Sequence, residues 1–256
     1  MILLYHSIEN EKSSINYRCC TRDWFRNNKI TREQKYTVIL ADVQSNVVEK
    51  AEELQKQDID AYPFQFDLAD TSTFQPLVEF ISKEFRKLDA LINNAAMLVD
   101  MGKHPSDLSE ELFRKVMEVN YIGPFLLTQK LVPLLKKSEA GRIVNLSNQV
   151  AQLKQLSDMN SPLREDICSA YQSSKIGVNA MTVLYAKELE EFGIKVNSCC
   201  PGWVDSAMNT EELPDYGEGA RPKTLSEGAD TSVWLATLSE DGPTAGFYTD
   251  RERIDW

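Results

Sequence analysis

From residue 36 onward, short apolar runs alternate with longer amphipathic stretches, and this alternation constrains the fold more than any other feature. The runs are mostly β-branched and apolar, which is typical of strands buried on both faces of a parallel sheet. Strand alternating with helix predicts right-handed crossovers and one α/β domain with a doubly wound parallel sheet. The expected strands are Thr37–Ala41, Ala61–Phe66, Ala90–Asn93, Arg142–Ser147, Lys195–Cys199 and Gly246–Tyr248. The expected helices are Val47–Gln57, Thr73–Lys87, Ser109–Lys137, Tyr171–Glu191 and Ser226–Leu238.

Several boundaries carry their own signals. Thr73 and Ser109 are candidate N-caps, and Gly193 can take the left-handed conformation that ends a helix. Residues 150–170 are expected to form a loop, and 246–248 a final strand with nothing after it. Residues 203–224 follow the carboxyl end of a strand, where this kind of sheet carries a substrate lid. A passive surface loop explains the composition of that segment equally well.

Charge and composition exclude several classes of function. The chain of 256 residues carries a formal net charge of −11, which repels nucleic acid and anionic membranes. A small molecule or a protein is therefore the expected partner. Five cysteines and two histidines show no metal-ligand spacing, so we expect no metal site. The apolar start is too short for a signal peptide and no long apolar run follows, which predicts a cytoplasmic protein.

The sharpest local signal is the pair Tyr171 and Lys175. Residues four apart lie on one face of a helix, so the phenol and the ammonium can share a site. A nearby cation favours the phenolate, so it would lower the phenol pKa from its ordinary value of about 10. Such a tyrosine could act as a general acid or base, although this spacing on its own also arises by accident on a surface.

The surrounding motifs favour a functional role for this pair over an accidental one. Asn93-Asn94-Ala95-Ala96 follows one apolar run, and Pro201-Gly202 follows another. Asn120 lies within a long helix, and Arg142–Ser147 forms a strand. With these motifs in this order, residues 36–256 resemble the short-chain dehydrogenase/reductase family, in particular its carbonyl-reductase-like members. The resemblance implies a Rossmann-like fold and an oxidoreductase that uses NAD or NADP on a small carbonyl compound or alcohol.

The resemblance also implies roles for individual residues. Tyr171 would be the general acid and base, Lys175 would lower its pKa and hold the nicotinamide ribose, and Asn120 would support a water-linked proton path to Lys175. Pro201 and Gly202 would lie beside the nicotinamide. Homo-oligomers are also compatible with the family, whose members often pair through the helices that here hold Asn120 and Tyr171. The cofactor groove would be lined by Asn93, Ala95 and Ala96, with Asp67 and Leu68 at the adenine.

Asp42 bears on the choice of cofactor. Asp42 stands at the end of the strand that, in the family, lies beside the adenosine ribose. A carboxylate at this place can accept hydrogen bonds from the ribose hydroxyls. The same carboxylate would repel a 2′-phosphate, and no arginine follows it in Asp42-Val43-Gln44. The sequence therefore favours NAD over NADP. The alternative is that Asp42 merely caps a helix.

The first departure from the family lies at the catalytic serine. That serine is the second of a pair, and here the pair reads Ser147-Asn148. Asn148 could donate a hydrogen bond to a substrate oxygen, but an amide cannot relay a proton as a hydroxyl does. Ser147 cannot take over, because one step along a strand reverses the side that a residue faces. Weakened catalysis or an altered substrate is the expected consequence.

The second departure is the glycine-rich phosphate loop, which is missing because residues 1–35 contain no glycine. Back-translating residues 10–32 with permitted codons and reading one base later gives MKKAALITGAAPGIGFEITRLLA. This string holds a strand, the family's loop and a helix, and it joins residue 34 at the usual spacing. We infer an out-of-frame N-terminal segment; a divergent terminus or an alternative first exon is the other explanation.

Two interpretations of function follow. If residues 1–35 are genuine, the sheet lacks its central first strand and the pyrophosphate site, since the family's strand order is 3-2-1-4-5-6. Asn148 and the missing glycines then favour a catalytically silent member of the family, which is either a binding or regulatory protein or a defective product without function. The intact Asn120, Tyr171 and Lys175 favour an active oxidoreductase. Epimerase or dehydratase activity is a weaker third option, because such relatives usually need a longer carboxyl-terminal domain.

Overall fold

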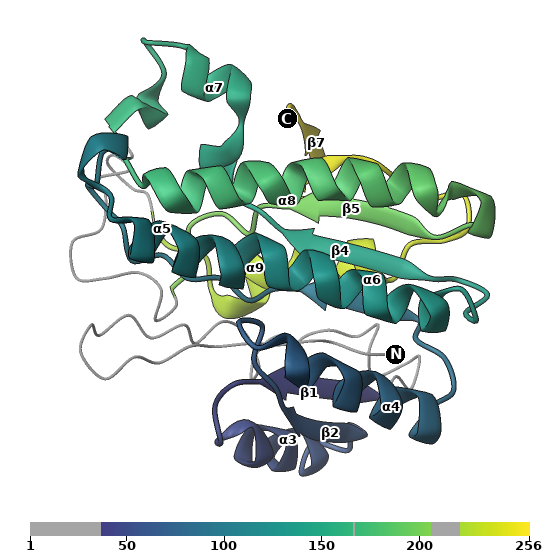
Figure 1. The fold of residues 1–256 in the computed structure, drawn as a ribbon. Helices are drawn as coiled ribbons and strands as arrows, with labels where there is room; N and C mark the ends of the chain where they lie inside the picture. Colours follow the sequence, from purple (N-terminus) through teal and green to yellow (C-terminus); the bar gives the residue numbers. More distant parts are fainter. Residues whose placement is uncertain (1–36, 166, 206–220) are drawn as a thin grey trace.

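The structure is a computed structural model that describes residues 37–165, 167–205 and 221–256. It has the expected α/β architecture, with strands alternating with helices (Figure 1). The strands are β1 (Val38–Asp42), β2 (Ala61–Gln65), β3 (Ala90–Asn93), β4 (Arg142–Leu146), β5 (Lys195–Cys199), β6 (Phe247–Thr249) and β7 (Glu252–Ile254). The main helices are α3 (Val47–Gln55), α4 (Phe74–Glu84), α5 (Glu110–Met117), α6 (Gly123–Leu135), α7 (Leu153–Ser157), α8 (Ser169–Glu188) and α9 (Leu225–Ala236).

The described strands form two hydrogen-bonded groups. β1 pairs with β2, and a five-stranded sheet has the order β3-β4-β5-β6-β7. Every pairing is parallel except the last, which joins β6 to β7. The expected central strand would come from the segment before residue 36, which lies outside the described residues.

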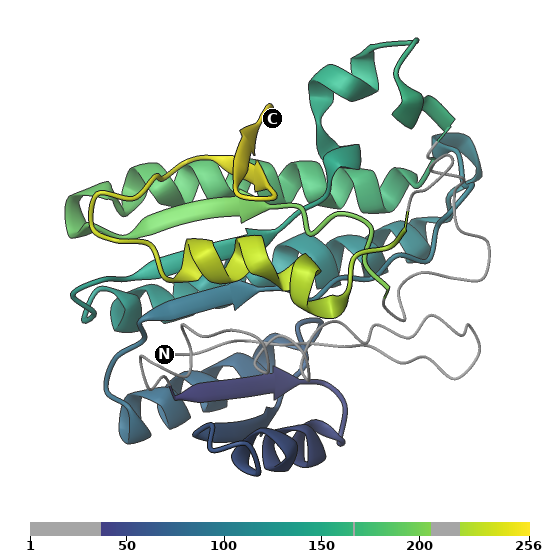
Figure 2. The ribbon, with the colours of Figure 1, turned by 180° about the vertical axis from the view of Figure 1, so that it is seen from behind.

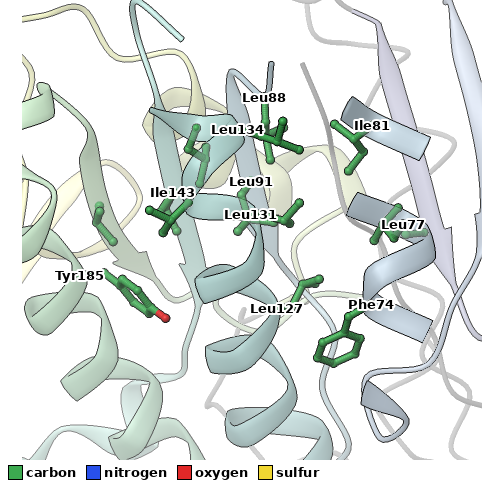
Figure 3. Close-up of a cluster of buried hydrophobic side chains, with 14 of the residues drawn as sticks. Phe74, Leu77, Ile81, Leu88, Leu91, Leu127, Leu131, Leu134, Ile143 and Tyr185 are labelled. Atoms are coloured by element: carbon green, nitrogen blue, oxygen red, sulfur yellow. The ribbon is translucent and has the colours of Figure 1, made fainter. Parts of the chain in front are cut away.

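Two hydrophobic cores span both groups of strands and show that they belong to one domain. Along β1, Ile39 and Ala41 enter one core, while Val38 and Leu40 enter the other. This is the alternation of a strand buried on both faces. Helices α4, α6 and α8 cover the first core, and α3 and α9 cover the second (Figures 1 and 2). Figure 3 shows leucines of α4, α6 and β3 interdigitating in the first core.

The helix predicted from Ser109 onward is interrupted by an irregular turn that contains Asn120. It begins as predicted, because the Ser109 side chain caps the helix by accepting from the Leu112 amide at 3.2 Å. Between α5 and α6, residues Glu118–Ile122 form a π-helical turn. Such turns insert an extra residue into a helix and are frequent at functional sites. Thr73 precedes α4, but its side chain makes no cap hydrogen bond there.

Two predictions about the chain's less regular parts were wrong. The segment 150–170 is no simple loop, because it contains α7, which projects beyond the start of α8 (Figure 1). The chain does not stop at the strand near residue 248, because Asp250 and Arg251 take left-handed conformations and turn it back into β7. Both elements are shorter than the windows in which periodicity is visible. None of the described helices is long and apolar enough to cross a membrane.

Candidate active site

The parallel strands bring the predicted residues to one edge of the domain. Asp42 and Asn93 are the last residues of β1 and β3, Asn148 follows β4, and Pro201 follows β5. The carboxyl ends of parallel strands are where folds of this kind bind their ligands. Helix α8 passes over the sheet and carries Tyr171 in its first turn. The site is therefore assembled from segments that are far apart along the chain.

Tyr171 and Lys175 lie together, as their spacing predicts. Both side chains are buried, with 3% and 2% of their surface exposed. The Lys175 ammonium is 5.5 Å from the centroid of the Tyr171 ring. It donates to the Leu146 carbonyl at 2.7 Å, the one hydrogen bond it makes among the described residues. An ammonium has three donors, so Lys175 retains capacity for a ligand's hydroxyl groups.

Asn148 faces the phenol from the loop after β4. Its Oδ1 accepts from the Val150 amide at 3.1 Å, which fixes Nδ2 as the atom turned toward Tyr171. Nδ2 then donates to the Tyr171 hydroxyl at 3.4 Å, a long hydrogen bond. Ser147 points elsewhere and donates to the Lys175 carbonyl at 3.3 Å. Ser147 and Asn148 thus point in different directions, as expected, and the Asn148 amide lies beside the phenol.

The electrostatics of the pair differ from the sequence-based expectation. Burial raises the pKa of the Tyr171 phenol above its ordinary value, and this outweighs the hydrogen bond from Asn148, which lowers it. Burial also lowers the pKa of Lys175 to about 8. The expected lowering of the tyrosine pKa by the lysine is therefore not found. The phenol is protonated at neutral pH, ready to act as an acid.

Asn120 lies in the π-helical turn and ties three segments together. Its Oδ1 accepts from the Met97 amide at 2.7 Å, and its Nδ2 donates to the Met97 carbonyl at 2.9 Å. Nδ2 also donates to the Ser174 hydroxyl on α8 at 3.0 Å. Asn120 is thus linked to α8 through its hydrogen bond to Ser174. No direct hydrogen bond joins Asn120 to Lys175 among the described residues.

The Asn93 side chain is engaged within the protein. Its Nδ2 donates to Thr128 at 3.1 Å and to Asn145 of β4 at 2.7 Å. Asn145 continues the network to Thr182 of α8 at 2.9 Å. This buried network holds the strand ends and α8 in register, so Asn93 supports the edge on which the site is built. Of its two alanine neighbours, Ala95 packs into the first core, while Ala96 lies in a small cluster with Tyr171.

The predicted adenosine end lies on the other group of strands. Asp42 is fully buried and accepts from the Gln44 amide at 3.0 Å and from Lys50 of α3 at 3.4 Å. Asp67 accepts from the Ala69 amide at 2.8 Å, so its carboxylate caps a turn. Leu68 is buried in the first core. Neither the N-terminal segment nor residues 206–220 lie within the described residues.

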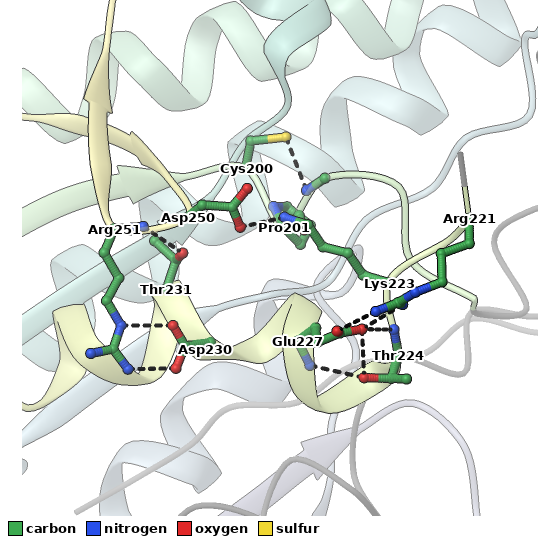
Figure 4. Close-up of polar contacts among 11 residues, drawn as sticks. Cys200, Pro201, Arg221, Lys223, Thr224, Glu227, Asp230, Thr231, Asp250 and Arg251 are labelled. Atoms are coloured by element: carbon green, nitrogen blue, oxygen red, sulfur yellow. Dashed lines mark hydrogen bonds and ion pairs between the residues drawn. The ribbon is translucent and has the colours of Figure 1, made fainter. Parts of the chain in front are cut away.

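The loop after β5 is held by contacts that sequence reasoning missed (Figure 4). Lys223 donates to the Pro201 carbonyl at 3.2 Å and pairs with Asp250 at 2.5 Å. Gly202 has φ +78°, a left-handed backbone conformation that favours glycine. The Cys200 thiol accepts from the Gly202 amide at 3.4 Å. These contacts join segments distant in sequence and leave no periodic signal.

Comparisons with known proteins identify the family of this chain. A sequence model described as short chain dehydrogenase matches residues 28–217. The chain belongs to the short chain dehydrogenase family. Its relatives in this family include pig carbonyl reductase [NADPH] 1, 29% identical over 242 residues, with 80% of this chain and 79% of the relative covered. (+)-Neomenthol dehydrogenase from Arabidopsis thaliana is 30% identical over 251 residues, covering 79% of this chain and 81% of the relative.

Solved structures of this family share the fold. Salutaridine reductase from Papaver somniferum has a TM-score of 0.71 at 25% identity, covering 96% of this chain and 99% of that one. An NADPH-bound carbonyl reductase from chicken fatty liver has a TM-score of 0.72 at 22% identity, covering 86% and 88%. The second likeness shows the fold alone. By lineage, the chain is an oxidoreductase of the short chain dehydrogenase family.

Proposed function

We propose that this chain is an NAD(P)-dependent oxidoreductase that reduces the carbonyl group of a small molecule, with Tyr171 as general acid. The observation that carries the proposal is the arrangement of a buried, protonated phenol, a half-buried amide donor and a buried ammonium at the carboxyl edge of the sheet. Its family membership supports the reaction type, and the names of its relatives support a carbonyl substrate.

Each side chain of the site has a separate role in the proposed reduction. A nicotinamide cofactor, when bound, would supply the hydride for the carbonyl carbon. Tyr171 transfers its phenolic proton to the carbonyl oxygen, which becomes the alcohol, and the phenolate is then reprotonated from solvent. Asn148 donates a hydrogen bond to the same oxygen as negative charge develops there. The ammonium of Lys175 stabilises the phenolate left behind.

The described residues fit a dinucleotide at both of its ends. Lys175 has donors to spare for the nicotinamide ribose, and Gly202 places no side chain beside it. Asp42 closes β1 with a buried carboxylate suited to ribose hydroxyls. Asp67 and Leu68 would lie at the adenine, and Ala95 and Ala96 would line the groove between the two ends. Pro201 and Gly202 would contact the nicotinamide.

We propose NAD as the preferred cofactor, because Asp42 would repel a 2′-phosphate. The NADPH in the names of the carbonyl reductases describes those proteins, and Lys50 beside Asp42 is the cation that could oppose this preference. NADH should therefore bind more tightly than NADPH, and Asp42→Ser should narrow the difference. Dissociation constants for both cofactors test this, and tighter NADPH binding by the unaltered chain would overturn the preference.

The reduction is tested by cofactor oxidation with a panel of ketones and aldehydes. Tyr171→Phe should lose at least about 100-fold in kcat, because the proton donor is gone. Tyr185→Phe is the matched control: this tyrosine lies on the same helix, and its hydroxyl donates to the Phe125 carbonyl at 2.9 Å, away from the site. Equal activity of the chain and Tyr171→Phe would contradict the proposal.

A catalytically silent binding protein is the second candidate, and Asn148 is the observation that favours it. An amide beside the phenol can polarise a carbonyl but cannot relay a proton. The two candidates separate when cofactor binding and turnover are measured together. Saturable binding of NADH with no turnover of any carbonyl, by the chain and by Asn148→Ser alike, would establish the silent member.

A further inference from the structure

The loop that follows β3 clamps the start of the catalytic helix. Met97, at one end of this loop, is held by two backbone hydrogen bonds with the Asn120 side chain: its amide donates to Oδ1, and its carbonyl accepts from Nδ2. At the other end, the Gly102 amide donates to the Ile167 carbonyl at 2.7 Å, and Ser169 donates to the Lys103 carbonyl at 2.8 Å. Residues 97–103 therefore connect the π-helical turn to the first residues of α8.

Asp100 lies in the middle of this loop and is fully buried. Its Oδ2 accepts from the Ala170 amide at 2.6 Å and from the Tyr171 amide at 3.3 Å. These are the second and third amides of α8, the groups that an N-cap side chain normally satisfies. The N-cap residue itself, Cys168, makes no such hydrogen bond. Asp100 therefore caps α8 from a separate segment of the chain.

A buried carboxylate is more than the capping of a helix requires. The second oxygen of Asp100, Oδ1, is buried and has no partner among the described residues. Burying a charge is costly, and a neutral asparagine or serine caps a helix about as well. The charge also acts on the site: with burial as the main cause, and with Cys200 and Cys168, Asp100 helps to raise the pKa of the Tyr171 phenol.

We propose that Asp100 is a positioning residue for the reduction, holding the backbone of Tyr171 so that its hydroxyl stays beside Asn148. The inference rests on the proposed function of Tyr171. The chain of contacts runs from Asn120 through Met97 to Asp100, and from Asp100 to the residue that carries the phenol. A shift of about 1 Å at a reacting group can reduce a rate about 100-fold, so such a clamp matters for kcat.

Two variants of Asp100 separate the hydrogen bonds from the charge. Asp100→Ala removes the acceptor and should lower kcat about 10- to 100-fold with little change in the KM for cofactor. Asp100→Asn keeps an acceptor oxygen and should recover most of kcat. Because Asn lacks the negative charge, the phenol ionises more easily, so the alkaline limb of the kcat profile should move to lower pH. The amides of residues 170 and 171 should exchange hydrogen faster in Asp100→Ala.

Asp89→Asn is the matched control. Asp89 precedes β3 at the opposite edge of the sheet and accepts from Ser138 and Lys87 at 2.5 and 2.8 Å. Its replacement should lower the Tm but leave kcat and the alkaline limb unchanged. If Asp100→Ala and Asp89→Asn lose Tm and kcat in the same proportion, the role is merely structural and the proposal is overturned.

The outcomes also distinguish this proposal from the proposed function. An inactive Tyr171→Phe together with unchanged kcat and pH profile in both Asp100 variants would overturn the positioning role alone. An active Tyr171→Phe would overturn the proposed function and the positioning role with it. If Asp100→Ala does not fold, the alkaline limb of Asp100→Asn decides, and an unmoved limb counts against the proposal.

Discussion

At the residue scale, the site depends on a small number of polar side chains, most of them buried, which are oriented by their hydrogen bonds. Asn148 is held by the Val150 amide and turned toward the phenol, while Ser147 faces the Lys175 backbone. The amide can donate to a developing oxyanion, but its hydrogen bond to Tyr171 is long. Under the proposed function, the amide would preserve polarisation of the carbonyl but would not relay a proton.

Substitutions at Asn148 test that division of roles. Asn148→Ser should raise kcat, because a hydroxyl both donates and relays, and Asn148→Leu should lower it about 10- to 100-fold by removing the donor. Ser147→Ala should change kcat little, because that hydroxyl lies on the other side. Steady-state rates with one carbonyl substrate are sufficient, and a fully active Asn148→Leu would show that the amide does not touch the reacting oxygen.

The burial of Lys175 makes stability depend on pH in a defined window. Its pKa is lowered to about 8 in the native state by burial, whereas an unfolded lysine titrates near about 10.4. Between these values the unfolded chain binds more protons, so this group makes the free energy of unfolding rise with pH. The raised pKa of Tyr171 has the opposite effect above about pH 10, because there the native state holds the extra proton.

Urea unfolding at several pH values checks this sign. The free energy of unfolding of the chain, relative to that of Lys175→Met, should rise between about pH 8 and pH 10. Lys187→Met is the control, since Lys187 lies in the exposed last turn of the same helix. A relative stability that stays flat or falls in this window would show that Lys175 is charged and solvated in the native state.

At the element scale, the π-helical turn between α5 and α6 places the Asn120 side chain in contact with two other segments. Without the extra residue in this turn, the Asn120 side chain would rotate away from Met97 and Ser174. Its hydrogen bonds satisfy both backbone groups of Met97, which are buried. The turn thus supports the loop 97–103 and, through it, the start of α8.

Replacing two buried asparagines should give opposite results. Asn120→Leu leaves the Met97 amide and carbonyl without partners and should lower the free energy of unfolding by about 2–6 kcal/mol, at about 1–3 kcal/mol per group. Asn179→Leu should be neutral or stabilising, because both polar atoms of the Asn179 side chain are buried and unpartnered within the described residues. Denaturant unfolding measures both, and equal losses would contradict the hydrogen-bond account.

The sequence predicts the regular elements well and the irregular ones poorly. β3 and β5 match their predicted bounds. In β3 the continuous apolar run Ala90–Ile92 marks a buried strand clearly. α7 and β7 were missed, because three to five residues show no period. The pair Tyr171 and Lys175 follows from helical spacing, whereas Asp100 becomes visible only when the loop and α8 are placed together.

At the scale of the whole molecule, the two ends of the proposed cofactor site belong to different groups of strands. Asp42 ends β1 of the two-stranded group, while Asn148 and Pro201 follow strands of the five-stranded sheet. The shared cores hold these groups together. The family's phosphate loop would lie between them, and residues 1–35 contain no glycine with which to build it.

An altered N-terminus therefore has a predictable effect on binding. A chain in which residues 10–32 are replaced by MKKAALITGAAPGIGFEITRLLA should bind NADH more tightly than the unaltered chain, because its loop amides can reach the pyrophosphate. The same chain with its loop glycines changed to alanine should lose that gain. The nucleotide sequence of the gene gives an independent check, since the shifted frame must encode this string.

The most direct test of the whole account is a fluorescence titration of the purified chain with NADH. We predict saturable binding that is tighter for NADH than for NADPH and is strengthened by the glycine-containing N-terminus. This result would place Asp42 at the ribose and establish the carboxyl edge of the sheet as a dinucleotide site. Absence of saturable binding to either chain, at concentrations where both are folded, would contradict the proposed oxidoreductase.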